Sequence, residues 1–305
     1  MCKAAIKRAE LFDPDAPCIR IYHQNLLDQF VGRGEHIGFP FFELDTFNRV
    51  ERHHLSNCDR LFVTSEWGKE VVHNNIGTDT PVHVIPLGVD LDVFQPSPPE
   101  KSDKTIFFNC GKWEVRKGHD ILITAFKQAF DVGDNVELWM MCDNPFNTPE
   151  ENQKWLTLYD HPNVRIINRV QTHKDVYNIM SQVTCGVFPS RGEGWNMEAL
   201  EMMACGKQMI ITDYSAHTQF CTHQNSHLVG TSGLELAMDN KWFFGQGSWA
   251  SLSGDNIATI SEHMKSIHQH KQSGTGMINH EAIKTAHSLS WDNAALEIKK
   301  VLDNV

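Results

Sequence analysis

The stretch that decides the fold runs from Arg191 to Lys207 and reads RGEGWNMEALEMMACGK. An apolar, strand-like run over 184–188 precedes it, and a Pro-Ser pair ends that run. Gly192 and Gly194 then form a turn, about three turns of good helix formers follow, and Gly206 stands where such a helix ends. The stretch therefore predicts a strand, a glycine turn and a helix whose first free N–H groups are open to an anion.

Two glutamates stand out in this stretch, Glu193 on the turn and Glu201 eight residues later on the helix. Met197, Glu201 and Ala204 recur at helical spacing, so Glu201 shares a face with apolar neighbours. A carboxylate in such a place needs a partner, because burying it unpaired is costly. On the residues alone a simpler interpretation stays open, in which Glu193 caps the helix and Glu201 is an ordinary surface acid.

Residues 193–206, EGWNMEALEMMACG, resemble the E-x7-E signature of the retaining, GT4-type glycosyltransferases. These enzymes have the α/β GT-B fold, in which two Rossmann-like, parallel-sheet domains face a central cleft. The resemblance implies that Glu193 holds hydroxyls of the donor sugar and that Glu201 binds the ribose of the nucleotide. Asn196 stands where a second glycine is common in the family. The resemblance also implies that the diphosphate meets the backbone of Gly194, Trp195, Asn196 and Met197.

A second motif, the loop CGKWEVRKGHD over 110–120, lies between a strand-like run and an amphipathic, helix-like run. Two cations five positions apart on this glycine-hinged loop, Lys112 and Lys117, can grip a diphosphate. The loop resembles the family's G-[RK]-x-x-x-x-K-G segment, which implies donor-binding roles for Gly111 and both lysines, with Arg116 as a neighbouring reserve. Lys112 replaces the commoner arginine and offers a point charge instead of a bidentate fork. From the residues of the loop alone, the alternative interpretation stays open that it is a solvated basic loop that binds no phosphate.

Short strand-like and helix-like runs alternate along the chain, which indicates an α/β fold with parallel sheets. The segment PLGVDLDVFQP over 86–96 resembles the one that ends the first domain in this family, so we read its Asp-Leu-Asp as linker and expect no metal site. We expect a short acceptor-side domain, a proline-rich linker, a nucleotide-sugar domain and a last helix that returns to the first domain. Their expected bounds are 1–97, 98–103, 104–288 and 289–305.

The expected secondary structure follows the same alternation. The segment over 232–253 is rich in tryptophan, phenylalanine and glycine and favours no particular structure. The expected strands are 18–22, 36–42, 60–64, 83–87, 105–109, 136–141, 163–167, 184–188 and 208–212. Besides the helix of the central stretch, the expected helices are 1–12, 49–57, 66–74, 121–130, 174–181, 254–271 and 280–304.

Three further positions are chosen by their places in the expected sheets. His23 and Glu43 follow strand-like runs, and open α/β sheets bind ligands at the carboxyl ends of their strands. Both are acceptor-side candidates, and Glu43 falls close to where many relatives place a pocket histidine. The simpler interpretation is an ordinary loop acid and a partly buried histidine. By resemblance the nucleobase meets the backbone near Val170. Family members usually open with further βα units, so the first domain is expected to be truncated.

Composition argues against several classes of protein. A formal net charge of −11 disfavours a general nucleic-acid binder, which needs a basic face. The eight cysteines form no C-x-x-C pair and the seventeen histidines show no metal-ligand spacing, so we expect reduced thiols and no zinc. No apolar run approaches the roughly 18 residues of a membrane span, and the charged first residues do not resemble a signal peptide. We therefore expect a cytoplasmic protein without a strong membrane signal.

Together the motifs predict a hexosyltransferase-like glycosyltransferase. The resemblance to the family implies that it would move a sugar from a UDP- or GDP-sugar co-substrate with retention of configuration, no metal and no bound cofactor. As the diphosphate leaves, Lys112, Lys117 and the helix N-terminus would stabilise its growing charge while Glu193 orients the sugar. The expected acceptor is a glycan, a lipid or a small molecule, in preference to DNA. A partner chain or a second copy could complete the first domain.

Other classes of protein stay open. The chain could be a nucleotide-sugar-binding module without transferase activity, because its first domain is short. The same fold also supports nucleotide-sugar epimerases and phosphorylases, the latter with a pyridoxal-phosphate lysine. A dehydrogenase is disfavoured, because no strand leads into a G-x-G-x-x-G turn.

Overall fold

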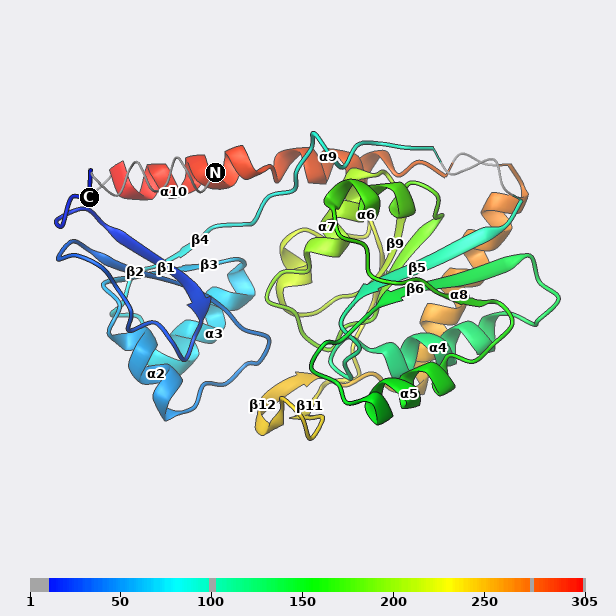
Figure 1. Ribbon diagram of the computed structural model, residues 1–305, viewed down its shortest axis with the longest axis horizontal. Coiled ribbons are helices and arrows are strands. Elements are labelled where there is room, and N and C mark those ends of the chain that lie inside the picture. Colours follow the sequence, from blue (N-terminus) through cyan, green and yellow to red (C-terminus); the bar gives the residue numbers. More distant parts are fainter. Residues whose placement is uncertain (1–10, 99–102, 275–276, 304–305) are drawn as a thin grey trace.

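The computed structural model describes residues 11–98, 103–274 and 277–303. The chain folds into two α/β units, each built on its own parallel sheet, which stand side by side with the first unit at the left of Figure 1. The expected α/β class with two Rossmann-like, parallel-sheet domains is confirmed. The helix expected over 1–12 and the linker expected over 98–103 fall largely outside the described residues.

The first unit has four parallel strands in the order β1-β2-β3-β4. Two helices lie in the described part of this unit, and both begin at side-chain caps: Asn48 forms a capping box with Glu51, and the Ser65 hydroxyl accepts from the N–H of Gly68. The strands and helices are β1 (Cys18–His23), β2 (His36–Phe41), α2 (Arg49–Ser56), β3 (Arg60–Val63), α3 (Glu66–Ile76) and β4 (Val82–Val84).

The second unit has six parallel strands in the order β10-β9-β8-β5-β6-β7. Its chain starts in the middle of the sheet at β5, builds outward through β6 and β7, and then returns to the other side of β5 at β8. The carboxyl ends of β5 and β8 therefore flank the point where the winding reverses, which is where doubly wound sheets bind ligands. The strands are β5 (Thr105–Gly111), β6 (Val136–Cys142), β7 (Val164–Ile166), β8 (Cys185–Phe188), β9 (Gln208–Thr212) and β10 (His227–Val229).

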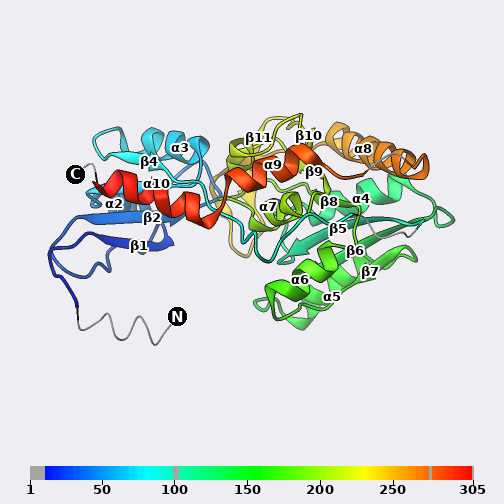
Figure 2. The ribbon, with the colours of Figure 1, turned by 90° about the horizontal axis from the view of Figure 1, so that it is seen from above.

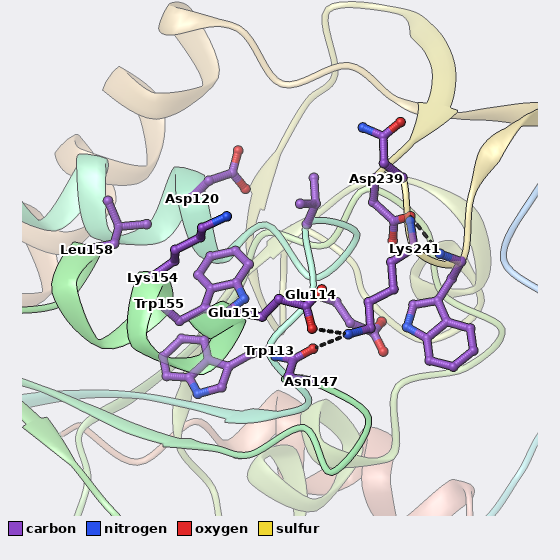
Figure 3. A pocket seen from close by; sticks show the side chains of 13 residues that line it. Trp113, Glu114, Asp120, Asn147, Glu151, Lys154, Trp155, Leu158, Asp239 and Lys241 are labelled. Carbon is purple, nitrogen blue, oxygen red and sulfur yellow. Dashed lines mark hydrogen bonds and ion pairs between the residues drawn. The ribbon is translucent and has the colours of Figure 1, made fainter. Parts of the chain in front are cut away.

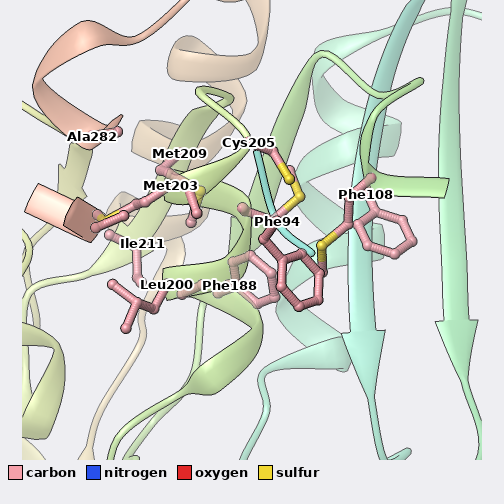
Figure 4. Close-up of a cluster of buried hydrophobic side chains, with 14 of the residues drawn as sticks. Phe94, Phe108, Phe188, Leu200, Met203, Cys205, Met209, Ile211 and Ala282 are labelled. Atoms are coloured by element: carbon pink, nitrogen blue, oxygen red, sulfur yellow. The ribbon is translucent and has the colours of Figure 1, made fainter. Parts of the chain in front are cut away.

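Helices pack on both faces of this second sheet, and each face has its own hydrophobic core. Figure 4 shows the core beneath α7, which contains Leu200 and Met203 together with Phe108 of β5 and Phe188 of β8. Phe94 is buried in the same core, so the segment after β4 is anchored on the second unit. The helices are α4 (His119–Ala129), α5 (Pro149–Leu158), α6 (His173–Met180), α7 (Met197–Ala204), the 3₁₀ turn η1 (Ser215–Gln219) and α8 (Gly254–Gln272).

The single helix expected over 280–304 is wrong, because the structure has two helices there, α9 (His280–Ser288) and α10 (Trp291–Asp303). The break falls where the chain crosses the segment that follows β4. The N–H of Val89 donates to the carbonyl of Leu289 at 2.9 Å. A Cβ on Gly88 would lie 2.1 Å from the backbone nitrogen of Trp291, so this crossing requires glycine.

Helix α10 returns to the first unit and lies along its sheet (Figure 2). Its Ile298, Val301 and Leu302 pack against the core that contains Phe39 and Phe62. Helix α9 instead packs on α7 of the second unit. The last two helices thus tie the two units together.

Several elements lie outside the sequence expectation: the short strand β10, the 3₁₀ turn η1, a hairpin and helix α5. The segment over 232–253 contains an antiparallel hairpin, β11 (Leu234–Met238) and β12 (Phe244–Ala250). Helix α5 begins at a capping box formed by Thr148 and Glu151. Figure 1 shows the hairpin and α5 at the same end of the second unit. Among the helices that the structure describes, none is long and apolar enough to cross a membrane.

Candidate functional site

The two sequence motifs meet at the switch point of the second sheet. The loop after β5 carries Arg116 and Lys117, and the loop after β8 carries Glu193. Arg116 Nη1 lies 2.7 Å from one carboxylate oxygen of Glu193, and Lys117 Nζ lies 3.0 Å from the other. Ser190 donates its hydroxyl to the same carboxylate at 2.8 Å, and the hydroxyl oxygen of Ser215 accepts from the N–H of Glu193 at 2.9 Å. We call this group the ionic centre.

The ionic centre is buried: Glu193, Arg116 and Lys117 are 5%, 7% and 8% exposed. Burial opposes the charge on Glu193, but Arg116 and Lys117 outweigh it and hold the pKa of Glu193 well below its ordinary value. Burial likewise opposes the charge on Lys117, and Glu193 overcomes it and raises the pKa of Lys117 above its ordinary value. All three groups are therefore ionised at neutral pH. Glu114 adds a second carboxylate, with Oε2 2.9 Å from Arg116 Nη2.

The turn before α7 is held by Asn196, where the family commonly has glycine. Asn196 has a φ of +86°, in the left-handed region that asparagine tolerates better than most residues with a side chain. Its Oδ1 accepts from the N–H of Ala199 at 3.1 Å, and its Nδ2 donates to His217 Nε2 at 2.9 Å. The other ring nitrogen of His217 donates to the carbonyl of Thr212. Burial lowers the pKa of His217 to about 4, so a neutral histidine fixes the turn.

Two polar groups on the central stretch have no partner among the described residues. Glu201 is half-buried on α7, and its carboxyl forms no hydrogen bond or ion pair there. Burial, and after it the nearby Glu198, raises the pKa of Glu201 to about 8. Trp195 is buried against Phe220, with ring centroids 4.9 Å apart, and its indole N–H is unpaired. Of the two, Glu201 is partly exposed and can meet a ligand, whereas the indole N–H of Trp195 is buried.

The remaining donor-side candidates surround the ionic centre. Lys112 stands apart from it: its side chain is 54% exposed, and Nζ lies 3.9 Å from Glu114 Oε1. Gly111 has a φ of +140°, and a Cβ there would lie 3.4 Å from Lys117 Cε, so glycine gives the lysine room to pass. Met197 is partly buried against the core beneath α7.

The first unit covers the ionic centre with the residues that follow β2. A Cβ on Gly192 would lie 2.5 Å from the carbonyl oxygen of Glu43, and one on Gly194 would lie 3.1 Å from that of Phe42. These two glycines therefore let the backbones of the two units approach closely. Thr64 donates its hydroxyl to the carbonyl of Gly194 across the same contact.

The two acceptor-side candidates, Glu43 and His23, differ in their burial. Burial raises the pKa of Glu43, and the positive charge of Arg116 opposes this rise while Glu193 adds to it. The carboxyl of Glu43 thus lies in the field of the ionic centre. His23 is exposed at the end of β1, with its ring edge-on to Tyr22. Of the two, Glu43 is the residue that the fold brings to the centre.

A cavity of about 760 Å³ lies at the carboxyl ends of β6 and β7. Cys142, Ile167 and Arg169 are among the residues that line it. Val170 follows directly in the sequence and is partly buried against the core beneath α7.

Several residues of the site are absent from the sequence expectation. Glu114 lies two positions before Arg116 in the loop, so a search for a carboxylate near the cations would have found it. Ser215 and His217 belong to η1 and reach the centre only because the chain after β9 turns back onto α7. The local sequence carries no sign of that return.

Family models match both units of the chain. A model described as "Glycosyl transferases group 1" matches residues 103–238, and one described as "Glycosyltransferase Family 4" matches residues 2–93. Each unit thus resembles a glycosyltransferase domain. The two motifs that form the ionic centre both fall within the range of the first model.

Solved structures show how this chain is folded. Sucrose-phosphate synthase from Thermosynechococcus elongatus has a TM-score of 0.69 at 16% identity, with 99% of this chain and 76% of that chain covered. HepE from Anabaena in complex with UDP-glucose has a TM-score of 0.69 at 15% identity, with 90% and 73% covered. These likenesses show that the chain has the GT-B fold.

A curated relative is matched over part of its length. The GDP-mannose-dependent alpha-(1-6)-phosphatidylinositol dimannoside mannosyltransferase of Mycobacterium tuberculosis is 23% identical over 175 residues, which cover 55% of this chain and 44% of the relative. The chain spans about half the length of the curated relatives it matches.

Proposed function

We propose that this glycosyltransferase moves a sugar from a nucleotide diphosphate to an acceptor hydroxyl, with retention of anomeric configuration and without a divalent metal. The observation that carries the proposal is the convergence of Arg116 and Lys117 on Glu193, which lies four positions before the first residue of α7. Two buried cations beside a helix N-terminus suit a diphosphate, and a carboxylate held among them suits sugar hydroxyls.

The charge of the centre fits the bond that breaks. When the bond between the anomeric carbon and the diphosphate oxygen breaks, the electron pair stays on the diphosphate. Lys117 remains an ammonium because its pKa lies above the ordinary value. Lys112, with its exposed side chain, can turn onto the same anion. These two lysines and the start of α7 supply the positive charge that a metal ion supplies in other phosphoryl-leaving reactions.

The retained configuration follows from where the acceptor enters. The acceptor oxygen forms its bond to the anomeric carbon on the face that the diphosphate leaves, and its proton passes to the departing phosphate oxygen. Glu193, aligned by Arg116, orients the sugar through its hydroxyls. Glu43 lies on the side of the first unit and positions the acceptor hydroxyl.

The nucleotide is assigned to the groups that lack partners. A carboxyl with a pKa of about 8 is largely protonated at neutral pH, so Glu201 can both donate to and accept from ribose hydroxyls. The cavity at the ends of β6 and β7 is large enough for a base beside Val170. HepE was solved with UDP-glucose and the mycobacterial relative is named for GDP-mannose, so UDP and GDP are the first nucleotides to test.

A thermal-unfolding panel tests the donor site. We would add UDP, GDP, ADP and TDP, and their glucose and mannose derivatives, to the wild type and to Lys117→Ala and Glu201→Ala. One diphosphate is expected to stabilise the wild type, by about 2.7 kcal/mol at a concentration 100 times its Kd. Both variants should lose most of that gain, because each lacks one of the donor contacts.

The matched control is Lys284→Ala, which removes a lysine whose side chain is 80% exposed on α9. It should keep the full stabilisation. If no nucleotide raises the unfolding temperature of the wild type, the donor site does not exist and the proposal is withdrawn. Once a donor is known, the anomeric coupling constant of the product by NMR decides between retention and inversion.

A further inference from the structure

A cavity of about 420 Å³ lies outside the ionic centre, between the loop after β5, helix α5 and the tip of the β11–β12 hairpin (Figure 3). Trp113 lines it from the loop, Lys154 and Trp155 from α5, and Trp242 from the hairpin tip. We call it the tryptophan cavity. Its volume is in the range of small-molecule sites.

One wall of the tryptophan cavity is a fixed aromatic surface. The indole of Trp155 is stacked on that of Trp113, with centroids 5.5 Å apart and planes 11° from parallel. Trp113 is itself buried against Tyr159 and His119, so it holds Trp155 in place. Trp155 is half-buried and borders the cavity. Trp242, the third tryptophan of the lining, is 44% exposed.

The polar groups of the cavity are held by partners of their own. Lys241 Nζ lies 2.6 Å from Glu151 Oε2 and donates to Asn147 Oδ1 at 2.8 Å, and Figure 3 shows both contacts across the cavity. Asp120 is paired with Arg191 at 2.8 Å. These groups are therefore pre-positioned, and they tie the hairpin tip to α5.

The charge of the lining excludes a phosphate. Four carboxylates line the cavity against the ammonium groups of Lys154 and Lys241, so negative charge exceeds positive charge in the lining. The carboxylates are those of Glu114, Asp120, Glu151 and Asp239. Aromatic faces combined with carboxylate and amide groups suit a neutral ligand that has apolar C–H faces and many hydroxyls.

We propose that the tryptophan cavity binds a saccharide and forms an acceptor subsite of this glycosyltransferase. A pyranose ring would pack a C–H face on Trp155, and its hydroxyls would bond to the carboxylates and amides around it. Glu114 joins the two sites, because it lines the cavity and its Oε2 also pairs with Arg116 of the ionic centre. The acceptor role rests on the proposed transferase function, whereas saccharide binding stands without it.

The hairpin also connects the cavity to the acceptor-side segment of the first unit. The N–H of Ser248 on β12 donates to Asp45 Oδ1 at 2.7 Å. Trp249, also on β12, packs in one apolar cluster with Leu44. Both contacts lie within two residues of Glu43, so the same hairpin borders the cavity and contacts the segment that covers the ionic centre.

Saturation-transfer NMR on the full chain tests the inference with four probes, maltose, cellobiose, lactose and sucrose. At least one disaccharide should bind the wild type, and Trp242→Ala should weaken its affinity by about tenfold or more. Trp291→Ala is the matched control, because Trp291 is 45% exposed on α10, away from the cavity. It should leave the affinity unchanged.

The outcomes separate this inference from the proposed function. If none of the four disaccharides binds, or if Trp242→Ala binds as well as the wild type, the tryptophan cavity is not a saccharide site. That result would leave the nucleotide-induced stabilisation of the wild type untouched. If a disaccharide binds and depends on Trp242 while no nucleotide stabilises the chain, saccharide binding holds and the transferase function fails.

Discussion

The ionic centre and the tryptophan cavity share Glu114, yet they are built in opposite ways. The ionic centre is buried, and its charges are paired across the ends of two neighbouring strands. The cavity is open, and a loop, a helix and a hairpin tip that are far apart in the sequence supply its walls. The strands of the sheet therefore fix the charged groups of the ionic centre. The residues of the tryptophan cavity come from segments outside the sheet.

Removing the carboxylate of the ionic centre should have the largest effect. In Glu193→Ala, Arg116 and Lys117 lose the carboxylate between them and stay buried with too little negative charge. Breaking a buried ion pair from one side costs about 3–5 kcal/mol. We expect a loss of that size in urea unfolding.

The control for this loss is an exposed ion pair. Glu281→Ala removes a carboxylate that lies 3.7 Å from Lys284 on the surface of α9. Exposed pairs contribute at most about 1 kcal/mol. If the two variants lost equal amounts of unfolding free energy, the ionic centre would be as solvated as an exposed ion pair. It would then no longer differ from the open cavity in its exposure to water.

The pH dependence of stability should reveal the unpartnered Glu201. Its folded pKa of about 8 lies above its unfolded value near 4.5, so between these values the native state keeps a proton that the unfolded state has released. Stability therefore falls as pH rises through this window. Glu201→Gln should remove a slope of up to about 1.4 kcal/mol per pH unit.

Urea unfolding of both proteins at pH 5 and pH 8 measures the difference. The variant should gain stability relative to the wild type at the higher pH. The other titrating groups are common to both proteins and cancel in the comparison. A difference that does not grow with pH would mean that the carboxyl of Glu201 is hydrated or paired, and not kept for a ligand.

The contrast between the two sites also marks what the sequence can predict. Lys117 and Glu193 are predicted because the segments that carry them resemble family motifs, and each segment directly follows a parallel strand of the sheet. The link from Asn196 through His217 to Thr212 was not found, because it depends on the chain returning to α7 after β9. Contacts of this kind, between residues far apart in the sequence, leave no periodic pattern in the sequence.

The same limit explains the errors in the fold. The apolar spacing over 280–304 suits one long helix, and the break is imposed by the crossing of Gly88 against Trp291. The hairpin has no clear alternation of buried and exposed residues, because it packs on Leu44 with little of its surface. The tryptophan cavity was therefore invisible in the sequence: Trp113 stands in the second motif, but Trp155 lies on α5, a helix outside the sequence expectation.

A smaller loss of stability is expected at Asn196, which has a left-handed backbone conformation and also caps α7. Asn196→Ala would place alanine at a φ of +86° and remove the acceptor for the N–H of Ala199. The left-handed conformation costs about 1–2 kcal/mol and the lost cap about 1 kcal/mol. Asn196→Gly also removes the cap, but glycine adopts the left-handed conformation without strain. It should therefore lower the free energy of unfolding in urea clearly less than Asn196→Ala does. If both variants lose equally, the bond to His217 outweighs the backbone.

The smallest change in stability should come from the hairpin tip. Trp242→Ala removes a side chain that is 44% exposed, and its aromatic contact is the edge of the exposed Phe146. Surface substitutions of this kind usually stay within about 0.5 kcal/mol. Trp155→Ala should cost several times more, because it uncovers Trp113. The two tryptophans line one cavity, so equal losses on urea unfolding would mean that Trp242 serves packing. A near-neutral Trp242→Ala that still loses disaccharide binding would mean that the hairpin tip is kept for the ligand.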